Sequence, residues 1–234
     1  MHYFLQEKQA LKMNDLAFNL DFSKNLAINS TDLEWTVSPS EGVSRKQFER
    51  EAAESGRTTA LVKFEAGARF DSHVHTAGEE IMVLEGVFSD ENGDYPAGTY
   101  LRHPPGSHHS PYSKDGCIIF VKLDHFLVDD KHTIVVREDE RKWAPGLGNL
   151  KVVSLHNYLG EHTALVLWPE GEHFQPHTHY GGEEILVLDG VFSDEFGDYP
   201  KGSWIRNAHM SQHNPFSNEG ALILVKVGHL PVED

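Results

Sequence analysis

The chain has 234 residues, 39% of them hydrophobic and 24% charged, which is ordinary for a soluble globular protein with room for two small domains. Its formal net charge of −16 argues against DNA, RNA and anionic membranes as partners, because phosphate groups are bound by clustered Lys and Arg. No apolar run is long enough for a signal peptide or a membrane span, and the single cysteine, Cys117, leaves no intrachain disulfide. These features predict a cytoplasmic protein.

One segment of the chain occurs twice. The residues that start at His73 return almost unchanged at His177, an offset of 177 − 73 = 104 positions. The match runs without a gap over residues 59–121 and 163–225, and about half of the aligned residues are identical. Such a match indicates a domain duplicated in tandem.

The duplication divides the chain into three parts. Residues 1–32 have no counterpart in the other repeat and are predicted to form an N-terminal arm. The first domain is predicted over residues 33–136 and the second over residues 137–234, with the boundary at the charged stretch 137–142.

Within each repeat, short apolar and β-branched runs alternate with Gly, Pro and Asp turn signals, a pattern typical of an all-β sandwich or barrel. Strands are predicted at residues 59–64, 81–84 and 117–123, and again at 163–168, 185–188 and 221–227. Cys117 is expected to be a small side chain in the core of such a strand. Only residues 44–55 have the composition of a short helix.

Each repeat carries the residue types that bind metal ions. His73 and His75 lie two positions apart, so on a strand they point to the same side, and Glu79 has the same parity whereas Glu80 should point away. His109 follows on a later strand. The matching residues of the second repeat are His177, His179, Glu183 and His213. Three imidazoles and one carboxylate suit zinc, iron, manganese, nickel or copper rather than magnesium or calcium.

The spacing of these residues resembles the two sequence motifs of cupins. The first motif, Gly-x5-His-x-His-x3-Glu-x6-Gly, begins at Gly67 and again at Gly171. The second motif, Gly-x5-Pro-x-Gly-x2-His, begins at Gly98; in the second repeat Ala208 and Met210 replace its proline and glycine. The chain therefore resembles a bicupin, which implies an all-β fold of two tandem double-stranded β-helix, or jelly-roll, barrels over about residues 33–231.

The stretch GEEx(I/L)VLxGxFSDExGxYPxGxxxR is similar to the cupin domain of ChrR-type anti-sigma factors. This resemblance implies zinc at both sites, bound by His73, His75, Glu79, His109, His177, His179, Glu183 and His213. Anti-sigma factors of this type also have an N-terminal zinc domain with a His-x3-Cys-x2-Cys pattern, which this chain lacks. Whether the partner is a sigma factor, another regulatory protein or a second copy of the chain is therefore left open.

Other repeated residues have structural interpretations. Arg102 and Arg206 are expected in ion pairs. The acidic residues of the repeated turn, among them Asp90 and Asp194, are expected at the surface. His209, four residues before a predicted ligand, is a candidate second-layer group or alternative ligand.

His103 and His108 have Asn207 and Gln212 as counterparts, and nothing in the sequence distinguishes these two histidines from ordinary core or surface residues. They are therefore not assigned to the sites.

Two functional hypotheses follow. With zinc, four protein ligands complete a tetrahedral site, which favours a sensor, regulatory or interaction module. With Fe(II), or with manganese or nickel, two coordination positions stay open, and the protein would be a dioxygenase that cleaves a diketone or hydroxyketone held in the barrel. The sequence leaves open whether the protein is an enzyme, and it favours the first hypothesis through its similarity to ChrR.

Overall fold

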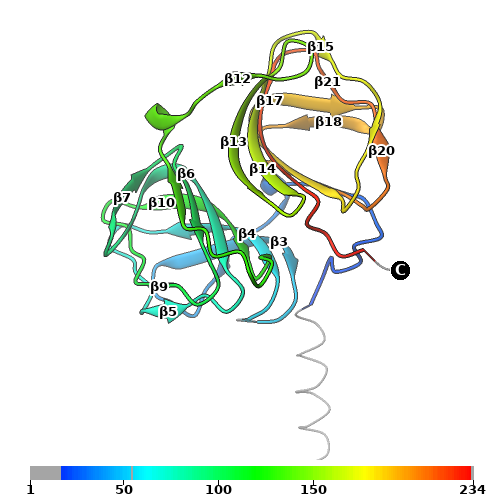
Figure 1. Ribbon diagram of the computed structural model, residues 1–234. Coiled ribbons are helices and arrows are strands. Elements are labelled where there is room, and N and C mark those ends of the chain that lie inside the picture. Colours follow the sequence, from blue (N-terminus) through cyan, green and yellow to red (C-terminus); the bar gives the residue numbers. More distant parts are fainter. Residues whose placement is uncertain (1–16, 54, 233–234) are drawn as a thin grey trace, which may run out of the picture. The chain divides into compact units, whose positions relative to one another are not determined.

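The computed structural model describes residues 17–53 and 55–232, so residues 1–16 of the predicted arm lie outside the described residues. The chain divides into two compact units. The first comprises Trp35–Glu138 and the described residues before Asp21, and the second comprises Asp21–Glu34 and the residues from Asp139 onward. Each unit is built from antiparallel strands, as Figure 1 shows. The described helical residues are two short 3-10 turns, η1 (Ser30–Asp32) and η2 (Glu138–Glu140).

The first unit contains one large sheet with the strand order β11-β8-β6-β10-β4-β3-β2, to which β7 is added through β6, and a small sheet of β5 and β9. Its strands are β2 (Thr36–Val37), β3 (Val43–Arg50), β4 (Thr58–Phe64), β5 (His73–Val74), β6 (Glu79–Asp90), β7 (Gly93–Pro96), β8 (Tyr100–His103), β9 (His108–His109), β10 (Cys117–Leu123) and β11 (Ile134–Val136).

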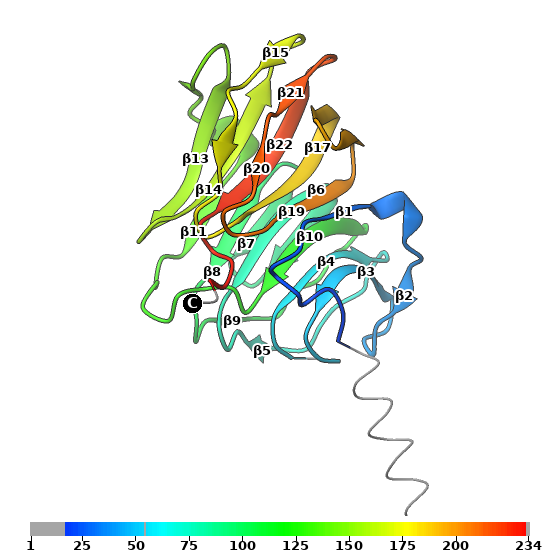
Figure 2. The same ribbon diagram turned by 90° about the vertical axis from the view of Figure 1, so that its right-hand side faces the viewer.

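The second unit repeats this order as β1-β19-β17-β22-β14-β13-β12, with β18 paired to β17, β15 to β21 and β16 to β20. Figure 2 shows β13, β14, β22 and β17 side by side. Its strands are β1 (Leu26–Asn29), β12 (Ala144–Pro145), β13 (Lys151–Tyr158), β14 (Glu161–Trp168), β15 (Glu172–His173), β16 (His177–Thr178), β17 (Glu183–Asp194), β18 (Gly197–Pro200), β19 (Ser203–Asn207), β20 (Gln212–His213), β21 (Phe216–Ser217) and β22 (Ala221–Val227).

The edge strand of each large sheet comes from a segment outside the repeated motifs. Strand β11 pairs with β8, with Ile134 opposite Arg102, and β1 pairs with the equivalent β19, with Leu26 opposite Arg206. An exposed strand edge is a template for unwanted pairing, and both β8 and β19 are covered in this way. Residues 26–29 of the predicted arm are therefore a strand of the second unit.

The core of each unit follows the period of two expected for strands. Along β4, the side chains of Ala60, Val62 and Phe64 point into the first core. Cys117 is buried in the same core, where burial raises the pKa of its thiol to about 11, as befits a packing residue. The second core contains Leu150, Trp168, Ile185, Val187, Phe192, Ile205, Ala221 and Ile223.

The helix predicted over residues 44–55 is wrong. Residues 43–50 form strand β3, which pairs with β4 along its length and with β2 on its other side. Tertiary pairing overrides the helix propensity of Arg, Gln, Glu and Ala here. As a strand, this segment pairs with the backbone hydrogen-bonding groups at the edge of β4, and it buries Val43 and Phe48. Its counterpart in the second unit is β13, which pairs with β14 in the same way.

A glycine marks an irregularity of pairing in each long strand. Gly86 and Gly190 both have φ +71°, and both sheets shift register near these residues. A Cβ on Gly86 would lie 2.1 Å from the Gly116 carbonyl oxygen, and one on Gly190 equally close to the Gly220 oxygen. Only glycine permits this close approach between neighbouring strands.

Candidate metal centres

The four predicted ligands of the first unit come together in the structure. His73 on β5 pairs directly with His109 on β9, His75 follows two residues later, and Glu79 begins β6. Each residue offers one ligand atom, and these atoms all lie within 4.8 Å of one another. His75, Glu79 and His109 are buried, and His73 is half-buried. His73, His75 and Glu79 therefore face one cluster together with His109, and the binding of a metal there stays a prediction.

The second unit repeats this arrangement. His177 on β16 pairs with His213 on β20, and His179 and Glu183 complete a group whose ligand atoms also lie within 4.8 Å of one another. The Glu183 Oε2 atom lies 3.5 Å from His179 Nε2 and 3.6 Å from His213 Nε2. The first unit has almost the same distances, 3.5 Å from Glu79 Oε2 to His75 Nε2 and 3.4 Å to His109 Nε2.

The imidazole nitrogens that face each cluster are suited to a metal ion. The Nε2 atoms of His75, His109, His179 and His213 are buried and make no hydrogen bond. Such orphaned nitrogens are costly in a protein interior unless a metal ion or another partner occupies them. His73 Nδ1 lies 3.0 Å from the Asp71 carbonyl oxygen, which only accepts, so its hydrogen is on Nδ1 and the Nε2 lone pair is free. The residues present therefore fit a transition metal ion.

Burial keeps three of the histidines, His75, His177 and His179, neutral, which is the form that binds metal, whereas at His109 the hydrogen bond with Asp90 and the charge of Glu79 outweigh burial and raise the pKa. Burial lowers the pKa of His75 to about 4 and that of His179 to about 3, and it also lowers the pKa of His177. At His75 the charge of Glu79 raises the pKa without reversing the effect of burial, and at His179 the neighbouring His213 and His177 lower the pKa further. At neutral pH these three imidazoles therefore carry free lone pairs.

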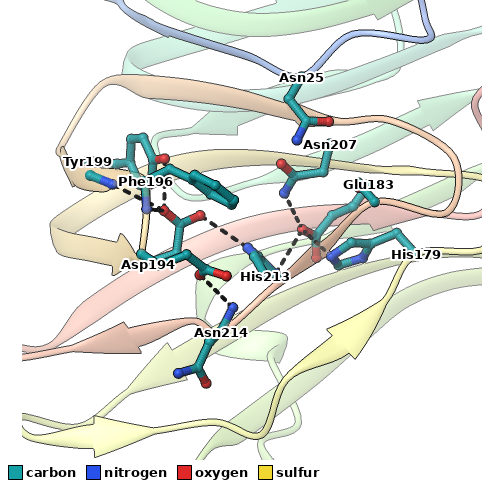
Figure 3. A network of polar contacts seen from close by, with 12 residues as sticks. Asn25, His179, Glu183, Asp194, Phe196, Tyr199, Asn207, His213 and Asn214 are labelled. Carbon is teal, nitrogen blue, oxygen red and sulfur yellow. Dashed lines mark hydrogen bonds and ion pairs between the residues drawn. The ribbon is translucent and has the colours of Figure 1, made fainter.

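A carboxylate supports one ligand in each unit, which sequence analysis missed. Asp90 and Asp194 were expected at the surface, but both are buried at the ends of β6 and β17. The Asp194 Oδ2 atom lies 3.2 Å from His213 Nδ1, and Asp90 Oδ2 lies 3.5 Å from His109 Nδ1. Figure 3 shows His213 between Asp194 and Glu183. Such a carboxylate fixes the imidazole tautomer and orientation, leaving Nε2 for the metal.

The supporting partner of the glutamate differs between the units. In the first unit His103, the last residue of β8, lies with its Nδ1 3.0 Å from Glu79 Oε2, and its ring stacks on that of His75. In the second unit Asn207 takes this place and donates a hydrogen bond to Glu183 Oε2 at 2.9 Å. His103 also forms a further potential ligand group with Asp90 and His109. His103 could have been identified in the sequence because it aligns, in the repeat, with Asn207, whose side chain also donates hydrogen bonds.

The two glutamates consequently differ in acidity. Burial raises the pKa of Glu79, but the hydrogen bond with His103 and the charges of His75 and His109 outweigh it and lower the pKa to about 2. At Glu183 burial dominates and raises the pKa, since His213 and the neutral Asn207 offset it only in part. The two sites thus share a ligand set and differ in its surroundings.

Other predicted residues take structural positions. Glu80 points away from the site, as expected, and accepts a hydrogen bond from Tyr100 Oη at 2.7 Å. Arg102 is fully buried in the expected ion pairs, with Nη2 2.8 Å from Asp130 Oδ2. His209 belongs to none of the ligand groups found among the described residues; its Nδ1 accepts a hydrogen bond from the Gly181 N–H at 2.9 Å.

A cavity of about 500 Å³ opens onto the cluster of the first unit. Its lining includes the predicted ligands His73, His75 and Glu79. This volume lies within the usual range for small-molecule sites. The metal site of the first unit is therefore accessible to a ligand of modest size.

The antiparallel barrels and their His/Glu clusters define two tandem cupin domains. The model of the ChrR cupin-like domain family matches the sequence twice, over residues 23–127 and 131–231, and the chain belongs to this family. Among proteins with curated descriptions, none matches the sequence.

Solved structures share the fold at low sequence identity. A candidate dioxygenase from Nostoc punctiforme has a TM-score of 0.73 at 15% identity, with 88% of this chain and 82% of that chain covered. The pirin YhhW from Escherichia coli, in complex with nickel(II), has a TM-score of 0.68 at 14% identity, with coverages of 90% and 100%. A deletion mutant of the Bacillus subtilis oxalate decarboxylase OxdC has a TM-score of 0.60 at 14% identity, with coverages of 87% and 76%.

The part of the chain that the structure describes contains no helix with the length and apolarity required to cross a bilayer.

Proposed function

We propose that this protein is a metal-binding bicupin in which each domain holds one divalent transition metal ion. The observation that carries the proposal is the convergence, in both units, of three imidazoles and one carboxylate, with two imidazole Nε2 atoms in each unit that are buried and make no hydrogen bond. The residues that would hold the ions are those predicted from the sequence. A buried cluster of neutral imidazoles beside a carboxylate is a costly arrangement without a cation and a favourable one with it.

We propose zinc as the metal and a sensor, regulatory or interaction role for the protein. Membership of the ChrR cupin-like family supports this choice. Four protein ligands complete the tetrahedral shell that structural zinc prefers, and the ion would then tie β5, β6 and β9 of the first unit together. Loss of a ligand would loosen this end of the barrel and change what it binds. The expected partner is a regulatory protein, with a sigma factor as one candidate.

A second candidate function is a dioxygenase with Fe(II), or with manganese or nickel. The observation that favours it is the cavity of the first unit, which opens onto His73, His75 and Glu79. An ion that accepts six ligands would keep two positions for a diketone or hydroxyketone and for O₂. Glu79 would be the group that accepts a proton from the substrate.

The test is the metal content of the purified full chain by elemental mass spectrometry, for the natural protein and for His75→Ala and His179→Ala. We expect about two metal ions per chain, one of which is lost with each substitution. His108→Ala is the matched control, because this exposed histidine adjoins His109 on β9 but does not belong to the cluster, and it should lose none. Retention of both ions in the two site variants contradicts the proposal.

The identity of the ion separates the two candidate functions. Zinc without oxygen consumption supports the sensor role. Iron, manganese or nickel, together with oxygen uptake on a panel of diketones and hydroxyketones, supports the dioxygenase.

A further inference from the structure

The second metal cluster lies beside a strand that the N-terminal arm supplies. Strand β1 pairs along its whole length with β19, and β19 ends at Asn207, whose side chain donates the hydrogen bond to Glu183 Oε2. The next backbone group, the Ala208 N–H, donates a hydrogen bond to Asn25 Oδ1 at 2.8 Å. Figure 3 shows Asn25, Asn207 and Glu183 in succession. A short path of hydrogen bonds therefore leads from the arm to a predicted metal ligand.

Asn25 compensates for a residue that distinguishes the second unit from the first. Ala208 stands where the first unit has Pro104, which has no backbone N–H. Ala208 is buried, and a buried N–H without an acceptor is costly, so this group requires a partner. Asn25, which lies at the surface, supplies the acceptor. The departure from the second cupin motif and the arm residue thus form a complementary pair.

The loop after Ala208 is bonded to a second predicted ligand. The Met210 N–H donates to the His179 carbonyl oxygen at 2.8 Å, and the His179 N–H donates to the Ser211 carbonyl oxygen at 3.1 Å. The first unit has the same two hydrogen bonds at the equivalent positions. The segment is therefore held to a glutamate ligand at its start and to a histidine ligand at its end, and Asn25 binds the backbone between these two contacts.

Further contacts hold the arm on β19. Arg206 is fully buried, its Nη2 donates to the Asp21 carbonyl oxygen at 3.0 Å, and its guanidinium carbon lies 4.7 Å from the centroid of the Phe22 ring. Near the other end of β19, Asn29 Nδ2 donates to Ser203 Oγ at 3.0 Å. The arm therefore contacts β19 at both ends as well as along its backbone.

We propose that docking of the arm on β19 and metal binding in the second unit are coupled, with Asn25 as the positioning residue that joins them. Glu183 and His179, once they are metal ligands, hold residues 207–211 in one position, so that the Ala208 N–H stays directed at Asn25. Without the ion, this segment and β1 loosen together. Because such coupling is reciprocal, docking of the arm strengthens metal binding by the same factor.

This inference rests on the proposed metal site and gives the proposed sensor an element that changes with its occupancy. Strand β1 is held firmly when the second site is occupied and less firmly when the site is empty. The edge strand of the first unit, β11, provides an internal comparison, because Pro104 has no N–H with which to make the equivalent hydrogen bond.

Competition with a chromophoric metal chelator on the metal-loaded full chain, analysed separately for the two units, tests one direction of the coupling. Asn25→Ala should weaken metal binding by the second unit about threefold to tenfold, the usual effect of one hydrogen bond, and binding by the first unit less than about twofold. Asn25→Asp keeps an acceptor oxygen and should retain most of the affinity. Asn218→Ala is the matched control, because this exposed asparagine lies between β21 and β22 of the same unit, and it should change neither affinity.

A double-mutant cycle separates this hydrogen bond from a general loosening of the arm. Ala208→Pro removes the N–H, as in the first unit, and Asn207 before it has the extended conformation that a following proline requires. In this background Asn25→Ala should change the metal affinity of the second unit less than about twofold. An equal loss from Asn25→Ala with and without Ala208→Pro would overturn the inference.

Hydrogen exchange of the natural chain, with its metal and after chelator treatment, tests the other direction. Metal removal should raise the exchange rate of the β1 amides about threefold or more and that of the β11 amides by less. Unchanged exchange in β1, or an equal rise in both strands, contradicts the coupling. Elemental analysis separates the two proposals. A chain without metal contradicts the proposed function, whereas a metal-loaded chain whose second unit is insensitive to Asn25→Ala contradicts only this inference.

Discussion

His103 Nδ1 lies 3.0 Å from Glu79 Oε2 and is the closest support that the structure gives to this predicted ligand. In the second unit Asn207 supports Glu183 at 2.9 Å. A histidine and an asparagine therefore perform one task, which is to hold a carboxylate oxygen in place beside the imidazoles. This exchange is the main difference between two otherwise similar ligand clusters.

The role of His103 predicts different results for two substitutions. His103→Ala should lower the metal affinity of the first unit by about 10-fold to 100-fold, the usual effect of removing an outer hydrogen-bond partner of a ligand. His103→Asn should retain most of the affinity, because Asn207 shows that an amide can make this contact. Competition with a chromophoric zinc chelator measures both values. Equal losses in the two variants contradict the positioning role.

The support of His213 by Asp194 predicts a loss confined to the second unit. Asp194→Asn keeps the shape of the side chain but removes the charge that orients His213, so the metal affinity of that unit should fall about 10-fold or more. Asp198→Asn is the matched control, since this exposed carboxylate accepts a hydrogen bond from Ser193 and does not contact the cluster. Competition with the same zinc chelator, analysed as separate loss of metal from the two units, measures the affinity of the second unit. An effect of equal size in the control would refute the assignment.

The depressed pKa values of His177 and His179 predict that the metal-free second unit loses stability in mild acid. Both groups take up protons near pH 6.5 in the unfolded chain but only at a lower pH in the folded chain, where the pKa of His179 is about 3 and that of His177 is also lowered. Their stabilising contribution is therefore present above about pH 6.5 and is lost as the pH falls. The raised pKa of Glu183 has the opposite effect on the pH dependence, but it concerns one proton, whereas the two histidines concern two.

Urea unfolding of the chelator-treated protein at pH 7.5 and pH 5 measures this dependence. The midpoint should be lower at pH 5, and His179→Asn should reduce the difference between the two values. A midpoint that rises toward pH 5 would show that the assigned protonation states are wrong.

The close approach of Gly86 to the Gly116 carbonyl predicts a large cost for a methyl group. Gly86→Ala should lower the free energy of unfolding by the cost of a left-handed alanine, about 1 kcal/mol, plus about 1–3 kcal/mol for the steric overlap. Gly67→Ala isolates the first contribution, because Gly67 has φ +81° and open space where its Cβ would lie. Chemical denaturation compares the two. Equal losses would mean that β6 shifts freely away from Gly116.

Three of the four proposed ligands in each unit follow from a local pattern, whereas His109 and His213, on later strands, were included through the resemblance to the second cupin motif. His73 and His75 share a face of a strand, Glu79 begins the next strand, and the repetition of the same spacing at His177 identified the pattern as a set. The duplication also indicated the all-β class, since short apolar runs between turn signals recur at fixed positions in both copies.

Only the tertiary structure decided what surrounds those ligands. Strand β3 formed over a sequence with helical composition because β4 required a partner, and Asp90 turned inward because it ends β6 beside His109. The support from His103 reaches the first site from β8, a strand distant in sequence from His73 and His75. Spacing along the chain fixes which side chains share a face, but contacts between distant strands depend on register and packing, which a local pattern does not specify.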